Sequence, residues 1–116
     1  MEKWISVKDQ LPESGQEVLA YFYDTVSERD SISLLTYFKE GEVMYRRIDR
    51  DPRKTKAQRF MNTLYGKDLD VKAKEDGFYE YEWDEKGDAC ARLIRDFTTH
   101  WMELPKGPII RAKSGL

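Results

Sequence analysis

Seven cationic side chains lie within residues 46–59, and they are the strongest chemical signal in the sequence. Arginine forks bind phosphate oxygens in pairs, and the nearby rings of Tyr45, Phe60 and Tyr65 could stack on bases. A nucleic-acid-binding or nucleotide-binding surface is therefore one hypothesis for function. The cations are Arg46, Arg47, Arg50, Arg53, Lys54, Lys56 and Arg59.

An acidic run follows over residues 68–88, and it supports two other interpretations of the charge pattern. In one, the basic stretch is a solvated loop and helix face that pairs internally with the acidic run. In the other, both blocks serve a protein partner, because patches of one sign steer association and select its register. Within the acidic run, Glu80, Glu82 and Asp84 could imitate the phosphate spacing of a nucleic acid, so they are candidate binding residues as well.

Catalytic and metal-binding chemistry has little support. His100 is the only histidine and Cys90 the only cysteine, whereas a zinc site needs about four ligands. No glycine-rich phosphate loop and no nucleophile elbow is present. We therefore expect no catalytic residue, no metal and no cofactor, which favours a non-enzymatic protein.

Composition limits the class of protein further. The chain has 116 residues, 40% of them hydrophobic and 36% charged, with a net charge of -2. These values predict one core under a charged exterior, with no overall attraction to nucleic acid or anionic lipid. A single cysteine excludes an intrachain disulfide and favours a reducing compartment, and no apolar run is typical of a signal peptide or a membrane span. We expect a cytoplasmic protein without membrane contact.

Short β-strands are the main structure that the hydrophobic pattern predicts. Residues 18–23 resemble a central strand with both faces covered, and a turn at 40–42 predicts a hairpin between strands at 31–38 and 43–48. In the strand at 77–83, Tyr79, Tyr81 and Trp83 share one face, opposite the glutamates. The remaining strands are expected at 4–7 and 97–102.

A helix is predicted at residues 54–65, because Ala57, Phe60, Met61 and Leu64 recur at spacings of three and four before Gly66. Residues 67–76 are expected to be a loop or a ragged edge, and 89–95 either a short helix or a strand. The pattern favours an α+β fold, a mainly antiparallel β-sheet of five or six short strands with one or two helices. A small barrel-like sheet is the alternative.

As for domains, we interpret residues 1–108 as a single globular domain with a charged middle insertion at about 46–76. Residues 109–116 are expected to be a flexible tail.

The two ends of the chain carry specific motifs. Residues 4–12 are W-I-S-V-K-D-Q-L-P, residues 17–21 are E-V-L-A-Y, and residues 99–105 are T-H-W-M-E-L-P. They resemble the family called domain of unknown function 551, whose members begin W-I-S-V-x-D-x-L-P and close with T-H-W-M-x-L-P. The resemblance implies a small protein of phages, prophages and other mobile elements, hence a bacterial host cytoplasm. Accessory proteins in that setting often counter host defence.

Trp4 and Trp101 suggest a physical role for these motifs. Both are large apolar side chains with one donor each, so two terminal strands could meet around a shared core that contains both tryptophans. The middle region would then be left to bind something else. Our leading hypothesis is a non-enzymatic phage or mobile-element protein that binds and modulates or inhibits a host factor, with nucleic-acid or nucleotide binding as the alternative.

Overall fold

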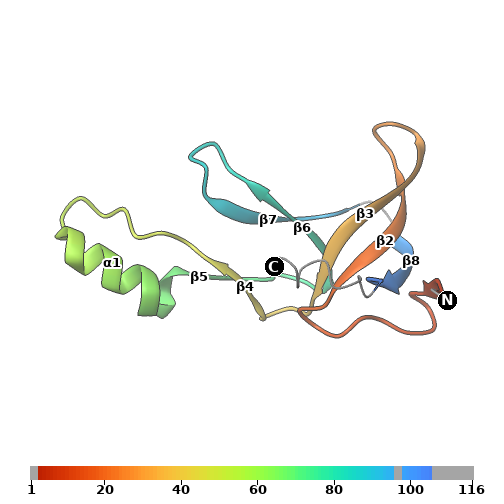
Figure 1. Cartoon of the computed structure of the whole chain (residues 1–116), viewed down its shortest axis with the longest axis horizontal. Coiled ribbons are helices and arrows are strands. Elements are labelled where there is room, and N and C mark those ends of the chain that lie inside the picture. The colour runs from red at the N-terminus through yellow and green to blue at the C-terminus, as the bar shows by residue number, and fades with distance from the viewer. Residues whose placement is uncertain (1–2, 96–97, 106–116) are drawn as a thin grey trace, which may run out of the picture.

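Six antiparallel strands form the main sheet of the computed structural model, which describes residues 3–95 and 98–105 (Figure 1). Their order across the sheet is β1-β8-β2-β3-β6-β7, and a separate two-stranded sheet pairs β4 with β5. The α+β class and the mainly antiparallel sheet are thus confirmed, and the expected tail at 109–116 lies outside the described residues. The strands are β1 (Ile5–Ser6), β2 (Glu17–Asp24), β3 (Arg29–Phe38), β4 (Val43–Arg46), β5 (Asp70–Lys72), β6 (Gly77–Trp83), β7 (Ala89–Leu93) and β8 (Thr98–Glu103).

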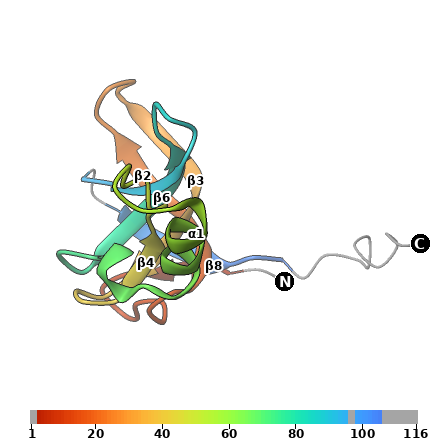
Figure 2. The same ribbon diagram turned by 90° about the vertical axis from the view of Figure 1, so that its left-hand side faces the viewer.

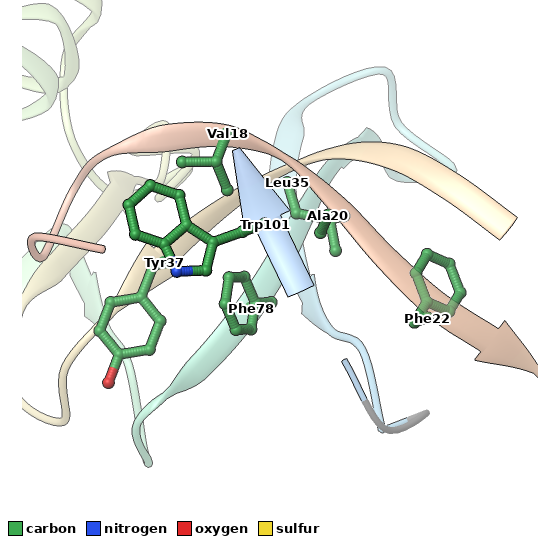
Figure 3. Packing of buried hydrophobic residues seen from close by; sticks show 7 residues of the cluster. All are labelled: Val18, Ala20, Phe22, Leu35, Tyr37, Phe78 and Trp101. Atoms are coloured by element: carbon green, nitrogen blue, oxygen red, sulfur yellow. The ribbon is translucent and has the colours of Figure 1, made fainter. Parts of the chain in front are cut away.

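The inner face of the main sheet carries the larger core. Alternation along β2 turns every second side chain inward, and β3, β6 and β8 add theirs at matching register. In Figure 3, Tyr37, Phe78 and the Trp101 indole gather at one end of the cluster and Phe22 lies at the other. The buried members are Val18, Ala20, Phe22, Leu35, Tyr37, Phe78 and Trp101.

The two terminal motifs do meet, but only one tryptophan enters the core. β1 pairs with β8 so that Ile5 lies opposite Trp101, which is 2% exposed and donates its indole N–H to the Gln10 carbonyl at 2.8 Å. Trp4 precedes Ile5, is 39% exposed and packs edge-on against Tyr21. The expectation of a core shared by both tryptophans is therefore wrong, because consecutive residues of an extended chain point to opposite faces.

The predicted hairpin between residues 31–38 and 43–48 is also wrong. β3 pairs with β6, and the chain turns at Gly41 into β4, which pairs with β5. Residues 67–76, expected as a loop or a ragged edge, contain β5 and a 3₁₀ turn, η1 (Lys67–Leu69). These pairings join segments far apart in the chain, which a local hydrophobic pattern does not reveal. Residues 89–93 are strand β7, which decides the alternative of helix or strand there.

The outer face of the sheet is covered only in part. Near the start of β4, a smaller cluster buries Phe38, Ala73 and Tyr79. Nearer the start of β3, Ile32 and Leu34 lie opposite Tyr21 and Leu19 of β2 and are 55% and 49% exposed. On β2 itself Tyr23 is 47% exposed, so the expectation that residues 18–23 are covered on both faces is wrong.

The helix α1 (Lys56–Tyr65) confirms the predicted amphipathic helix and lies at the tip of a projecting arm. We define the arm as residues 43–72, which run out along β4, through a loop to α1, and back along η1 and β5. Figure 1 shows α1 well away from β1 and β8, and Figure 2 views the molecule from the side on which α1 lies. Gly66 ends the helix with φ -78°, and a Cβ there would overlap the Asn62 side chain, so close approach requires glycine at this position.

Candidate functional site

Asp49 lies at the centre of a hydrogen-bond network in the arm. Its side chain accepts hydrogen bonds from the Lys54 ammonium at 2.6 Å, the Asn62 amide at 2.7 Å and the Asp51 backbone N–H at 2.9 Å. Its own backbone N–H donates to the Thr63 hydroxyl at 2.9 Å. Asp49 is only 7% exposed, and the Lys54 hydrogen bond, followed by those from Asp51 and Asn62, lowers the pKa of its carboxyl well below the usual range. The network ties the loop before α1 to the polar side of the helix.

The basic stretch is largely engaged within the chain. Arg46 donates to Asp70 and to the Leu64 carbonyl, and it thereby joins β4, β5 and the end of α1. Arg50 makes a two-point ion pair with Asp88 at 2.7 and 2.8 Å. These contacts are the internal pairing with the acidic run that one interpretation of the sequence proposed.

The other cations of the stretch differ in their engagement. Arg53 pairs with Asp51, Lys54 pairs with Asp49, and Arg59 donates to the carbonyls of Asp51 and Lys54. Arg47 and Lys56 make no ion pair with any residue of 3–95 and 98–105. Of the seven predicted cations, two therefore remain available for an outside ligand without breaking a contact.

The predicted acidic residues lie on the β6–β7 hairpin. Glu80 and Glu82 both face Arg92 of β7, at 2.6 and 3.5 Å. Asp84 accepts hydrogen bonds from the backbone N–H groups of Lys86 and Asp88 and so shapes the turn. The three carboxylates do lie along one edge of the hairpin, but each already has a partner inside the chain.

The structure brings part of both charge blocks to one cleft of about 450 Å3. Tyr45, Arg47 and Arg50 line it from the arm, and Asp84, Asp88 and other residues of the β6–β7 turn line it from the opposite side. Lys54, Lys56 and Arg59 lie outside it, on the loop and helix. Of the basic stretch, Arg47 and Arg50 line this cleft.

The apolar side of α1 was not among the candidate binding residues, all of which are charged. No residue of the helix is buried, and four large apolar side chains are exposed, Phe60 by 63%, Met61 by 52%, Leu64 by 45% and Tyr65 by 70%. A hollow of about 570 Å3, lined in part by Met61 and Tyr65, extends this surface. The spacing of three and four in the sequence already predicted an apolar side of this helix. The exposure of that side depends on how far the arm stands from the sheet.

A second overlooked feature is a cavity of about 300 Å3 on the outer face of the sheet, lined by Trp4, Tyr21, Thr99 and His100. The alternation of side chains along a strand could have predicted this cavity. Ile5 and Trp101 turn inward, so their neighbours Trp4 and His100 turn outward to the same face.

The setting of Cys90 does not favour a nucleophile. Burial, and then the nearby Glu82 and Asp84, raise the pKa of the Cys90 thiol, which disfavours the nucleophilic thiolate. Within residues 3–95 and 98–105, no His, Cys, Asp and Glu side chains gather as a metal site. In the same part of the chain, no helix has the length and apolar character needed to cross a bilayer.

These observations define an α+β protein in which a curved antiparallel sheet carries a projecting, helix-tipped arm. The two terminal motifs form β1 and β8 at one edge of the sheet, and the arm is the middle of the chain. The chain belongs to the family described as protein of unknown function (DUF551), whose model matches residues 3–109. Searches of curated proteins and of solved structures return no match.

Proposed function

We propose that this protein is a non-enzymatic binding protein that presents α1 to a protein partner and thereby modulates or inhibits that partner. One observation carries the proposal: the helix exposes Phe60, Met61, Leu64 and Tyr65 and buries none of its residues. Burying one such side chain in a partner is worth about 1.5–3 kcal/mol. Four together are enough to anchor an interface.

The way in which α1 is held supports this role. A ten-residue helix is marginal in water by itself, because helices shorter than about 12–15 residues do not repay their nucleation cost. Here the helix is held by its N-terminal cap at Thr55 and, through Asn62 and Thr63, by the Asp49 network, all of them polar contacts. The apolar side is thus pre-formed and left free, which lowers the entropic cost of binding.

Charge indicates the chemistry of the partner. Lys56 begins the helix and Lys67 follows it, and neither forms an ion pair within residues 3–95 and 98–105. An apolar helix face flanked by cations fits an apolar groove with an acidic rim, the helix-in-groove mode of recognition. The phage and mobile-element setting implied by the family resemblance favours a bacterial host factor in the cytoplasm, including a component of a defence system.

Nucleic-acid binding is the less favoured alternative. Five of the seven cations in the basic stretch already contact carboxylates or carbonyls of the chain. Only Arg47 and Lys56 would meet phosphates without losing such a contact, and two phosphate contacts give weak affinity with a shallow salt dependence. Protein binding through α1 needs no such rearrangement.

A comparison of two surface variants tests the proposal. Phe60→Ser removes an apolar side chain from α1, and Val26→Ser removes one that is 91% exposed in the β2–β3 loop. We expect Phe60→Ser to abolish capture of a stoichiometric partner from host lysate, while Val26→Ser and the wild type retain it. Both variants should unfold within about 0.5 kcal/mol of the wild type, because neither side chain is buried. Equal capture by the wild type and Phe60→Ser would rule out α1 as the binding surface.

A further inference from the structure

Three aromatic rings converge at the cavity on the outer face of the sheet. The Trp4 and Tyr21 ring centroids are 5.9 Å apart with an interplanar angle of 74°, and those of Tyr21 and His100 are 6.3 Å apart at 89°. With Thr99 they line a space of about 300 Å3. The Thr99 hydroxyl lies 2.9 Å from His100 Nδ1, which helps to orient the imidazole.

The backbone explains why these rings meet. Tyr21 and His100 are direct partners in the β2–β8 ladder, and β1 pairs along the other edge of β8 and brings Trp4 to the same face. A register irregularity between Tyr21 and Phe22 interrupts the ladder at this point. Such irregularities re-aim side chains at the surface of a sheet. None of the three rings belongs to the buried core, so core packing does not account for them.

One carboxylate contacts a ring that lines the cavity. The Tyr21 hydroxyl donates a hydrogen bond of 2.7 Å to the Asp30 carboxylate. This hydrogen bond, with smaller contributions from desolvation and the charge of Asp30, raises the pKa of Tyr21, so the phenol stays a neutral donor. None of the described residues that line the cavity is Lys or Arg. A carboxylate beside aromatic rings attracts a cation and repels a phosphate.

We propose that this aromatic corner, formed by Trp4, Tyr21 and His100 beside Asp30, binds an organic ammonium group of the trimethylammonium class. The neighbouring rings meet edge to face and so differ in orientation around the cavity, and the ring quadrupole attracts a compact cation that lies over a ring face. These rings would not sandwich a flat nucleobase, because a sandwich needs two parallel ring faces and adjacent rings here stand at 74° and 89°. The site is distinct from the arm and does not depend on it.

A titration of the full chain with choline and its neutral isostere, in which carbon replaces the ammonium nitrogen, separates cation recognition from apolar burial. We expect a saturable shift of the Trp4 indole N–H signal in NMR spectra and an upfield shift of the ligand methyl protons. Choline should bind about tenfold more tightly than the isostere, as cation–π attraction at a partly desolvated site predicts. Equal affinities for the two ligands, or an unchanged indole signal, would overturn the proposal.

Matched tryptophan variants locate the binding. Trp4→Leu keeps apolar bulk but removes a π face, and Trp83→Leu makes the same change on β6, where Trp83 is 76% exposed and outside the cavity. Trp4→Leu should weaken choline binding about tenfold and Trp83→Leu should leave it unchanged. If Trp4→Leu fails to fold, Asp30→Asn replaces it, and this variant should weaken choline but not the isostere. Wild-type affinity in a folded Trp4→Leu or Asp30→Asn variant would refute the assignment.

Three probes distinguish the sources of the ammonium group. They are free choline, a trimethyllysine peptide with its unmethylated counterpart, and phosphatidylcholine vesicles. Binding of any one that is lost in Trp4→Leu supports the site, and the tightest identifies the source. Failure of all three to bind at millimolar concentration would overturn the proposal.

Discussion

The Asp49 carboxylate accepts hydrogen bonds from an ammonium, an amide and a backbone N–H, and it is the most enclosed charged group of the arm. An acid in such a setting is stabilised as the anion, and the folded chain therefore releases its proton at lower pH than the unfolded chain. At residue scale this makes the arm sensitive to acid. Nothing in the local sequence distinguishes Asp49 from Asp51 beforehand; the fold does, by bringing Asn62 and Thr63 back to it.

Acid should loosen the arm before the sheet. Because the folded pKa of Asp49 is lowered, its stabilisation is fully present above the unfolded pKa of about 4 and is lost as pH falls through the folded pKa. Asp51 has a lowered pKa as well, mainly through Arg53, and acts in the same direction. Between pH 4 and pH 2, we expect amide protection factors, which compare exchange with the intrinsic rate at the same pH, to fall in α1 more than in β2 and β8. In Asp49→Asn, α1 should already exchange faster at pH 7, and its remaining pH dependence should be smaller.

At the scale of elements, α1 depends on its own ends more than most helices do. Thr55 accepts from the Gln58 N–H at 3.1 Å and its N–H donates to the Gln58 side chain at 2.8 Å, forming a capping box. Near the other end of the helix, the Leu64 carbonyl accepts a hydrogen bond from the Arg46 guanidinium. With no buried residue, the helix has little packing energy to compensate for a lost cap.

Thr55→Ala should therefore destabilise α1 by about 1 kcal/mol, the usual cost of a lost N-cap. Amide exchange of the helix, measured by NMR, should accelerate roughly fivefold, while exchange in β2 and β3 stays unchanged. Thr55→Ser keeps the hydroxyl and serves as the control. Wild-type helix exchange in Thr55→Ala would show that the cap contributes nothing.

For the whole molecule, Trp101 connects the two ends of the chain with the centre of the sheet. It lies opposite Ile5 on β1 and Ala20 on β2, and its indole reaches the loop after β1. We expect Trp101→Ala to cost about 3–5 kcal/mol, because it leaves a cavity and removes a partly buried hydrogen bond. That is a large part of the 5–15 kcal/mol typical of a domain.

Urea unfolding followed by circular dichroism tests this cost, with Trp83→Ala as the matched control. Trp83 is 76% exposed, so its loss should change the free energy of unfolding by less than about 0.5 kcal/mol. Similar midpoints for the two variants would contradict the central position of Trp101.

The sequence alone predicted the class of the fold, a helix at 54–65 that the structure has at 56–65, and most strands, because period-two and helical spacing record which side of an element meets water. It also identified the basic and acidic blocks that meet at Arg50 and Asp88. Only the tertiary structure decided that β4 pairs with β5, that Trp4 faces outward and that α1 stands clear of the sheet. The physical reason is that strand pairing and exposure depend on contacts between distant segments, whereas periodicity describes one segment at a time.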